Sequence, residues 1–405
     1  MILTVAWRNI WRNKRRTLIT VASIFFALFF GLLIRSLQIG TFGKIADDAV
    51  SSYVGHIQIH HRGYWEEKII NNVFERNNEI ETKILQNEYV KSIVPRIESF
   101  SLASNGNRTK GCMVMGIDPE KENSMSKIAS KITEGQYLKQ DDDGAVIGDK
   151  LASFLNLTIG DTLVMIGQGY HSMSAAGLYP IRGIVHFPSP ELNGRAVYIT
   201  LAQAQDFYSV DNQLTSMSIL LHKNNNIAEV KEYLKEVTVD EDYEIMDWRE
   251  LLVELQQLID SKQTSSNVMV GLLYMIVAFG VFGTIVMMTA ERWREFGLLA
   301  AVGMKRIKLM LTVFIETVFL GILGLIAGFA VSLPIMYYFN INPIILEGEM
   351  AATYEEMGFE GVMVASVDLA FMINQIIIVG IIVLIAVSYP VLKLRKLKPA
   401  YAMKA

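Results

Sequence analysis

Histidines that alternate along a predicted strand are the first residues in this sequence that could do chemistry, because imidazole binds zinc. His56 and His60 fall on one face of that strand and His61 on the other, and no carboxylate stands at the spacing of a metal ligand. The acidic run 141–143 lacks the spacing of an EF-hand calcium loop, so we interpret it as a turn. The sequence therefore predicts no metal site.

Motifs of the common catalytic sites are also missing. The Gly43-Lys44 pair is followed by Ile45 and has no P-loop pattern around it, and the sequence contains no HExxH or GxSxG motif. We therefore predict that the chain is not an enzyme, has no catalytic residues and binds no cofactor itself.

The positions of the charged residues indicate what kind of protein this is. Only 19% of residues are charged, whereas soluble domains carry about 25%. Cutting the chain at its charges leaves four long apolar windows, at 17–34, 263–290, 317–346 and 369–392. A bilayer core of about 30 Å needs about 20 apolar residues as helix. The sequence predicts an α-helical membrane protein with four transmembrane helices and excludes a soluble enzyme.

Lysine and arginine beside these windows predict the topology. Segments 1–16, 291–308 and 393–405 hold five each, whereas 347–368 holds six acids and no base. The positive-inside rule then places both termini in the cytoplasm. The predicted segments are an amphipathic interfacial helix at 1–16, transmembrane helices at 17–39, 266–290, 309–341 and 369–392, a cytoplasmic segment at 291–308, a short acidic outer loop at 342–368 and a cytoplasmic tail at 393–405.

Residues 40–265 form a large domain inserted between transmembrane helices 1 and 2. Alternating strand and helix patterns predict an α+β fold on the outer side of the membrane. The domain holds 21 basic and 32 acidic residues, hence a net charge of −11, which argues against nucleic acid as a partner. The one cysteine, Cys112, cannot form an intrachain disulfide.

The third predicted span holds a carboxylate and two spaced glycines. An intramembrane carboxylate is a candidate functional group. Glu316 lies near the end of its span, so we expect it to pair with Arg15 or Arg16. The spacing of Gly324 and Gly328 is typical of closely packed membrane helices.

A pattern of acidic, basic and glycine residues occupies 291–318. It reads Glu-Arg-x-x-Glu-Phe-Gly, then Ala-Val-Gly, a basic stretch and a glutamate in the next helix. This pattern resembles the cytoplasmic coupling segment of ATP-binding-cassette (ABC) permeases of the MacB/FtsX/Lol superfamily, although Ala300 departs from it. The stretches 6–20, 115–119, 146–163 and 389–405 are also similar to that superfamily.

The resemblance implies a permease subunit that transmits ATP-driven motion to a periplasmic domain. It implies residence in the bacterial inner membrane in contact with membrane lipid. The expected partners are a separate cytoplasmic ABC ATPase, which would bind ATP and Mg, and a second permease, identical or paralogous. The resemblance also divides the periplasmic domain into two lobes, residues about 50–115 with 215–247 and residues 116–214.

The resemblance makes 291–308 the segment that docks on the ATPase. Apolar side chains would enter a groove of the ATPase, and glycines at 297 and 303 would allow sharp chain reversals on either side of them. Glu295 would pair with a basic residue of the ATPase or with Arg292. The predicted coupling residues are Glu291, Arg292, Glu295, Phe296, Gly297, Leu298, Leu299, Val302 and Gly303.

Among members of the superfamily, the chain looks most like lipoprotein-releasing permeases, which have this length and no fused ATPase. Their outer domain carries a protruding loop that engages a periplasmic lipoprotein carrier. Loop 168–179, with glycines expected to be flexible, lies where that hook would be, and its candidate contacts are Tyr170, Met173 and Leu178. A long turn without function is the alternative.

Two stripes of apolar residues could form a path for acyl chains. Each of these residues could instead face lipid or pack against another helix. The candidates are Phe25, Phe29, Leu33 and Leu37 in the first span and Met269, Leu273 and Ile276 in the second. The alternative functions are a MacB-like efflux or peptide-export permease, an FtsX-like transmembrane signal transmitter, and a receptor or membrane enzyme outside the superfamily.

Overall fold

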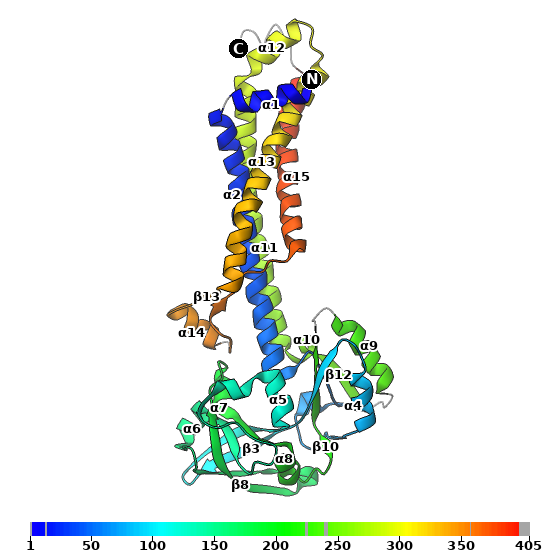
Figure 1. Ribbon diagram of the computed structural model, residues 1–405, viewed down its shortest axis with the longest axis vertical. Helices are drawn as coiled ribbons and strands as arrows, with labels where there is room; N and C mark the ends of the chain where they lie inside the picture. Colours follow the sequence, from blue (N-terminus) through cyan, green and yellow to red (C-terminus); the bar gives the residue numbers. More distant parts are fainter. Residues whose placement is uncertain (1, 13, 223–225, 239–241, 357, 397–405) are drawn as a thin grey trace. The chain divides into compact units, whose positions relative to one another are not determined.

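The computed structural model describes residues 2–12, 14–222, 226–238, 242–356 and 358–396 (Figure 1). It divides into two compact units. The helical unit consists of residues 1–43, 259–345 and 362–405, and the sheet unit of residues 44–258 and 346–361.

Four long helices carry the apolar windows of the sequence. In the described part of the chain, these four are long and apolar enough to cross a membrane, which confirms the predicted number of spans. They are α2 (Lys14–Ala49), α11 (Val253–Glu291), α13 (Arg306–Ile341) and α15 (Leu369–Arg395). The amphipathic α1 (Ile2–Arg12) lies across the end of this bundle (Figure 1), where Trp7 contacts Phe319 with ring centroids 5.8 Å apart.

Helices α2 and α11 continue past their apolar windows, because no proline or glycine cluster interrupts them. Helix α2 passes directly into a turn of π-helix, η1 (Val50–Val54). A short helix, α10 (Trp248–Leu251), precedes α11 and has Leu252 as its C-cap. A capping box between Asp247 and Glu250 begins α10, and α11 starts at Val253.

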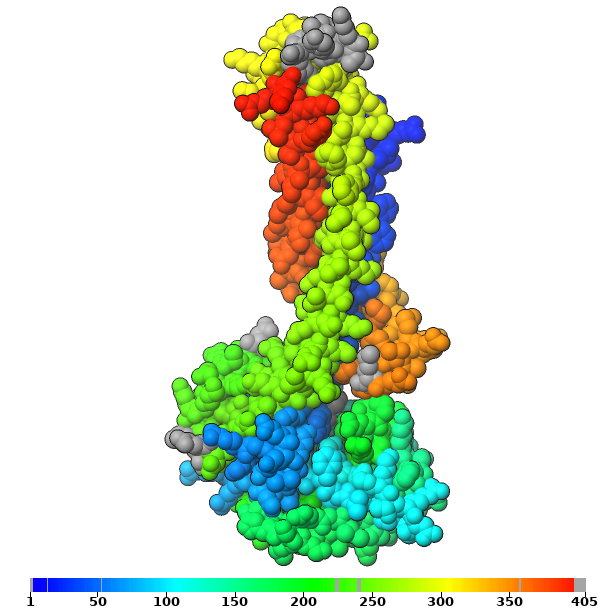
Figure 2. Space-filling model, turned by 180° about the vertical axis from the view of Figure 1, so that it is seen from behind, coloured from blue at the N-terminus to red at the C-terminus, as the bar shows by residue number. Residues whose placement is uncertain are grey.

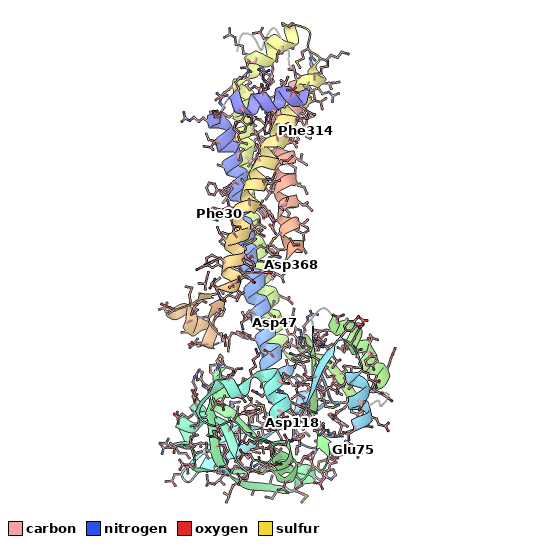
Figure 3. All side chains as sticks on the ribbon, viewed as in Figure 1. Phe30, Asp47, Glu75, Asp118, Phe314 and Asp368 are labelled. Atoms are coloured by element: carbon pink, nitrogen blue, oxygen red, sulfur yellow. The ribbon has the colours of Figure 1, made fainter. Side chains whose placement is uncertain are left out.

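Small residues let the helices of the bundle approach closely. A Cβ at Gly324 would lie 2.7 Å from the side chain of Ile24, and one at Gly328 would lie 3.1 Å from that of Leu28. Helix α13 therefore packs on α2 through the predicted glycine spacing. Away from these contacts the bundle presents apolar side chains, as at Phe30 and Phe314, which are labelled in Figure 3.

The sheet unit is built on ten strands, nine of which follow the order β12-β1-β11-β3-β4-β9-β6-β8-β5. Strand β7 pairs with both β3 and β8, so β3, β4, β9, β6, β8 and β7 close a ring. Strands of both predicted lobes belong to this one hydrogen-bonded sheet. The strands are β1 (Ile57–His61), β3 (Val90–Asn105), β4 (Arg108–Ile117), β5 (Ile132–Gly135), β6 (Ala145–Gly148), β7 (Thr162–Gln168), β8 (Ser174–Val185), β9 (Ala196–Thr200), β11 (Ser216–Leu221) and β12 (Tyr243–Asp247).

Short helices and two small ribbons complete the structure. In the sheet unit they are α3 (Tyr64–Glu67), α4 (Asn78–Leu85), α5 (Pro119–Ser126), η2 (Ile128–Lys131), α6 (Asp149–Leu155), η3 (Tyr170–Ser172), α7 (Pro190–Arg195), α8 (Leu201–Tyr208), α9 (Ile227–Val237), α14 (Glu349–Glu356) and the ribbon of β2 (Phe74–Glu75) with β10 (Gln213–Leu214). In the helical unit they are α12 (Trp293–Ala301) and the ribbon of β13 (Ile344–Ile345) with β14 (Val362–Met363). The predicted tail begins in the last turn of α15, and its residues from 397 onward lie outside the described part of the chain.

Candidate functional site

The predicted coupling segment contains a nine-residue helix, α12, with one exposed and one buried side. Leu298, Leu299 and Val302 are 53%, 44% and 81% exposed. Phe296 was expected to join this surface but is 1% exposed, because it packs against Leu309 and other side chains of α13 and α15. It therefore anchors α12 to the bundle and leaves the three aliphatic residues available.

The two glycines of the coupling segment have different roles. Gly303 has a φ of +100° and lies in the turn after α12, where a side chain would be strained. Gly297 was expected at a chain reversal, but it is buried in the middle of α12. Helix α12 begins at Trp293, before Gly297, so the chain does not reverse at that glycine.

Arginines and glutamates form a set of ion pairs at this end of the bundle. Arg292 donates two hydrogen bonds to Glu316, at 2.7 and 2.8 Å, so the expected pairing of Glu316 with Arg15 or Arg16 is wrong. Arg16 pairs with Glu291 instead. The register of α13 against the α11–α12 junction brings Arg292 to the carboxylate, and sequence spacing alone does not reveal that register.

Glu295 connects α12 to α1. It accepts two hydrogen bonds from Arg12, at 2.8 and 2.9 Å, and one from Arg292 at 3.3 Å. Partial burial raises the pKa of Glu295, but the hydrogen bonds and charges of Arg12 and Arg292 outweigh this, so the net pKa is lowered. Arg292, one of the two predicted partners, thus does pair with Glu295. Arg12 is a further partner that the sequence did not suggest.

The residues predicted to form a substrate path differ in exposure. Phe25, Phe29, Leu33 and Leu37 are half-buried along α2, and the rings of Phe25 and Phe29 stack at 5.6 Å. On α11, Leu273 packs into the core of the bundle.

Met269 and Ile276 are 60% and 74% exposed on α11. Figure 2 shows the side chains of α11, coloured green to yellow-green, along one face of the helical unit. Helix α11 is the least buried of the four spans.

The predicted hook proves to be a β-hairpin. Strand pairing between β7 and β8 reaches Gln168 and Ser174, so only 169–173 form the turn, and the expected loop 168–179 is wrong in its extent. Met173 and Leu178 are exposed, and Tyr170 is half-buried and stacks on His171 at 4.0 Å.

The glycines of this hairpin lie where neighbouring groups approach closely. A Cβ at Gly169 would lie 2.9 Å from the carbonyl oxygen of Tyr208, and one at Gly177 would lie 2.6 Å from the ring of Tyr179. Both positions therefore have little room for a side chain.

A buried ionic cluster in the sheet unit was missed by the sequence analysis. Arg96 on β3 donates two hydrogen bonds to Glu122 on α5, both at 2.8 Å, and one to Glu98 at 3.2 Å. It also donates to the carbonyl oxygen of Tyr53 in η1. Burial alone would lower the pKa of Arg96, but the charges of Glu122 and Glu98 raise it. The cluster therefore ties η1, the turn that follows α2, to β3 and α5.

A signal for this cluster was present in the sequence. Arg96 and Glu98 stand two residues apart in an otherwise apolar stretch and so share one face of a strand. Their partner Glu122 lies 26 residues from Arg96, and only the folded structure brings it there.

Two family models match the chain, with the descriptions MacB-like periplasmic core domain for residues 17–237 and FtsX-like permease C-terminal for residues 267–399. The first alone covers more than half of the sequence. The chain belongs to the MacB/FtsX/Lol family of ABC transporter permeases. It is an inner-membrane protein with a periplasmic domain, and such permeases work with an ATPase subunit.

Relatives of this permease are known in several bacteria. It is 20% identical to the lipoprotein-releasing system transmembrane protein LolC of Xylella fastidiosa, over 78% of each chain. It is 21% identical to the lipoprotein-releasing system transmembrane protein LolE of Haemophilus influenzae, over 74% of this chain and 73% of LolE. It is 24% identical to HrtB of Staphylococcus haemolyticus, named as a hemin transport system permease protein, over 52% of this chain and 54% of HrtB.

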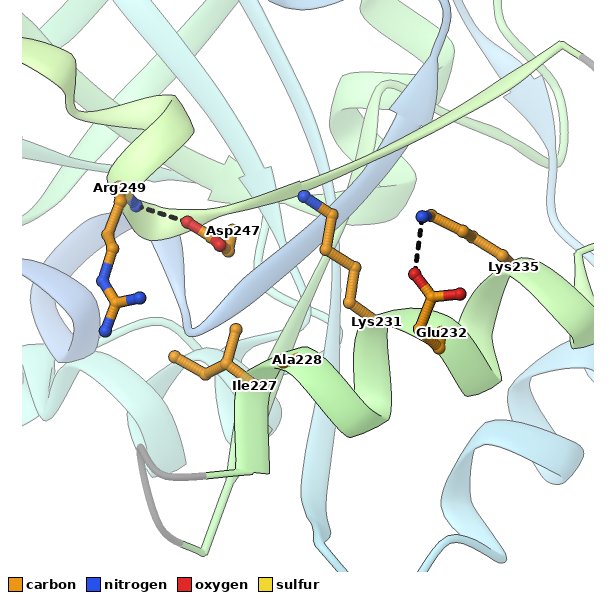
Figure 4. A pocket seen from close by; sticks show the side chains of 7 residues that line it. All are labelled: Ile227, Ala228, Lys231, Glu232, Lys235, Asp247 and Arg249. Atoms are coloured by element: carbon orange, nitrogen blue, oxygen red, sulfur yellow. Dashed lines mark hydrogen bonds and ion pairs between the residues drawn. The ribbon is translucent and has the colours of Figure 1, made fainter.

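The permease also has a polar pocket of about 580 Å³ beside α9 (Figure 4). Its charged groups contact one another: Lys235 pairs with Glu232 at 2.8 Å, and Asp247 accepts a hydrogen bond from the backbone of Arg249 at 2.8 Å. Among the described residues, no group of three or more His, Cys, Asp or Glu side chains is placed to hold a metal ion.

Proposed function

We propose that this permease releases lipoproteins from the inner membrane to a periplasmic carrier. The observation that carries the proposal is the alignment with LolC, which spans 78% of both chains. In this proposal a separate ABC ATPase binds ATP and Mg, and two permeases, identical or paralogous, face each other. The broad apolar surface of α11 supports a facing partner, because a surface of that kind is covered by lipid or by another protein.

The proposed orientation places α12 and both termini in the cytoplasm. The lysines and arginines that cluster in segments 1–16, 291–308 and 393–405 support this orientation. A reporter that is active only in the periplasm should be active when fused after Glu356 and silent when fused after Lys305. The reverse result at either position would contradict the orientation.

Force transmission would begin at α12. Its exposed aliphatic residues would enter a groove of the ATPase, while Phe296 and the Arg292–Glu316 pair hold α12 on the bundle. Motion of α2 would then reach the sheet unit through the π-helical turn and the carbonyl of Tyr53, which Arg96 holds.

Replacing Leu299 by Asp tests the docking step, because it places a charge in an apolar groove. Leu299→Asp should reach the membrane but lose the ATPase on purification, and Glu295→Lys should weaken the complex. Ile345→Asp is the matched control, since Ile345 is also exposed but lies beyond the other end of α13. Retention of a coupled ATPase by Leu299→Asp would exclude α12 as the docking helix.

The substrate is tested by photocrosslinking within the spans. Crosslinkers at Phe29 or Met269 should capture lipidated precursors from cells. Capture of soluble peptides or small molecules instead would favour the second candidate, an efflux or peptide-export permease. The match to HrtB, whose name refers to hemin transport, supports a small-molecule substrate.

The hairpin is tested by substitution, because deletion of 168–179 would remove residues that β8 needs for pairing. Met173→Ser with Leu178→Ser should leave assembly and ATPase activity intact and reduce release of lipoproteins to the carrier. Ile159→Ser, at another exposed apolar residue of the sheet unit, is the control. Normal release by the double variant would remove the hairpin from the mechanism.

A further inference from the structure

Helix α1 has two apolar sides, and the bundle covers only one of them. Ala6 and Ile10 are buried, and Ile10 packs into an apolar cluster with side chains of α11 and α13. Leu3, Trp7 and Trp11 recur every four residues and so form a neighbouring stripe, in which all three side chains are exposed. The rings of Trp7 and Trp11 contact each other, with centroids 5.9 Å apart. An exposed stripe of this kind suits the boundary between water and lipid, where tryptophan is enriched.

The third side of α1 is cationic. Arg8 and Arg12 stand four residues apart, share one face of the helix and are both exposed. This face lies next to the tryptophan stripe, because Arg8 comes one residue after Trp7 and Arg12 one residue after Trp11. Helices that lie on anionic membranes combine an apolar face and a basic face in this way.

Positive charge is in large excess at this end of the helical unit. Segments 1–16 and 291–308 hold ten lysines and arginines against two acids, Glu291 and Glu295. Both acids are already paired within the chain, since Glu291 binds Arg16 and Glu295 binds two arginines. The two acids therefore leave most of these cations without a counter-charge.

Three of these cations lie on α1 and at the start of α2. Arg8, Lys14 and Arg15 are exposed, and none of them forms an ion pair with a residue that the structure describes. The carboxylate of Glu316 on α13 is buried and bonded to Arg292, so it does not serve them. Their counter-charge therefore comes from outside the chain.

Arg12 is the cation through which a bound anion would act on α12. It donates hydrogen bonds to Glu295 of that helix, but both side chains are largely exposed. Exposed ion pairs are weak, so their partners can exchange. A phosphate group offers a guanidinium the same charge-assisted hydrogen bonds as a carboxylate does.

We propose that α1 binds the phosphate group of an anionic phospholipid with Arg8 and Arg12, while the Leu3, Trp7 and Trp11 stripe enters the acyl boundary of the membrane. On binding, Arg12 exchanges Glu295 for the phosphate. The contact between α1 and α12 is thereby loosened in a membrane rich in anionic lipid. The inference goes beyond the proposed release of lipoproteins and does not depend on it, since it concerns the helical unit and its membrane alone.

The test uses the full chain in phosphatidylcholine nanodiscs that contain phosphatidylglycerol with a photoreactive group at the start of one acyl chain. Mass spectrometry should find adducts on peptides of α1, and unlabelled phosphatidylglycerol should compete for them. Phosphatidylcholine with the same photoreactive group should label α1 about ten-fold less, because it carries no net charge. Equal labelling by the two lipids would overturn the choice of an anionic headgroup, and adducts confined to the four long helices would overturn the site.

Substitution of the cations locates the site. Arg8→Gln with Arg12→Gln should reduce labelling of α1 by phosphatidylglycerol about ten-fold. Arg8→Lys with Arg12→Lys should keep most of the labelling, which separates loss of charge from loss of the helix. The matched control is Lys305→Gln with Lys308→Gln, which removes two exposed cations at the start of α13 and should leave the labelling nearly unchanged. An equal loss in the control would overturn α1 as the site.

Glu295→Gln tests the exchange of partners at Arg12. It removes the anion with which the lipid competes, so labelling of α1 by phosphatidylglycerol should rise about two- to five-fold. Glu291→Gln is the control, because its partner is Arg16, and it should change the labelling less. Unchanged labelling in Glu295→Gln would overturn the exchange.

Discussion

Arginine–carboxylate pairs occur in both units of this permease, but in opposite surroundings. The side chains of Arg12 and Glu295 are 60% and 50% exposed at the basic end of the bundle. Those of Arg96 and Glu122 are each 1% exposed in the sheet unit. Exposed pairs contribute little and can exchange partners, whereas breaking a buried pair leaves an uncompensated charge. The exposed pair therefore suits a contact beside α12 that can change. The buried pair suits a fixed joint between η1, β3 and α5.

The largest effect is expected at the fixed joint. Arg96→Met would leave the buried carboxylates of Glu98 and Glu122 without their cation and should destabilise the sheet unit by about 3–5 kcal/mol. Hydrogen–deuterium exchange of the β3 peptide in the full chain would show this as loss of protection. Adding Glu98→Gln and Glu122→Met should restore most of the protection, and failure to do so would mean that Arg96 acts through packing instead of charge.

An intermediate effect is expected for the half-buried pair of Arg292 and Glu316. The side chains are 13% and 4% exposed, so Arg292→Gln should cost about 1–3 kcal/mol by leaving Glu316 unpaired. Thermal melting of the single variants and of the double variant with Glu316→Gln would measure the coupling. Additive effects of the two substitutions would contradict a direct interaction.

A smaller effect is expected for the exposed pair. Arg12→Gln should change the melting temperature by the equivalent of less than about 1 kcal/mol, because solvent screens the interaction. Its consequence should instead be weaker retention of the ATPase, since Arg12 joins α1 to α12. A melting shift as large as that of Arg292→Gln would remove the distinction between exposed and buried pairs.

The pH dependence of this pair follows from the lowered pKa of Glu295. A carboxyl group whose pKa is lower in the folded state stabilises the fold above its unfolded pKa, and this contribution is lost as the pH falls through the folded pKa. The difference in stability between the unaltered chain and Glu295→Gln should therefore be constant near neutral pH and disappear only in acid. A difference that changes between pH 6 and pH 8 would contradict this assignment.

The smallest effect is expected for chemical labelling of Cys112, which reports whether the sheet unit is intact. Burial raises the pKa of Cys112 to about 12, so maleimide at pH 7.5 should not modify the folded chain. Ser172→Cys, in the exposed hairpin turn, should react in the same sample. Labelling of Cys112 should rise in Arg96→Met, and unchanged labelling there would indicate that the joint does not hold β3 and β4 together.

Properties that depend on neighbouring residues could be predicted from the sequence alone. The four spans and the close approach at Gly324 follow from local composition and periodicity, and the structure bears them out. Family membership also follows, because its motifs are short and contiguous. Burial of Phe296 and the pairing of Glu316 with Arg292 could not be predicted, since they depend on how α12 and α13 pack.

The tertiary structure alone decided the remaining features of the candidate site. Pairing of β7 with β8 converted the expected loop into a hairpin, because strand register is a property of two segments together. The contacts of Arg96 with Glu122 and Tyr53 join residues that are far apart in the chain. The sequence shows which charged and aromatic side chains the chain contains. Their partners are decided only when the sheet and its helices pack and bury these side chains together.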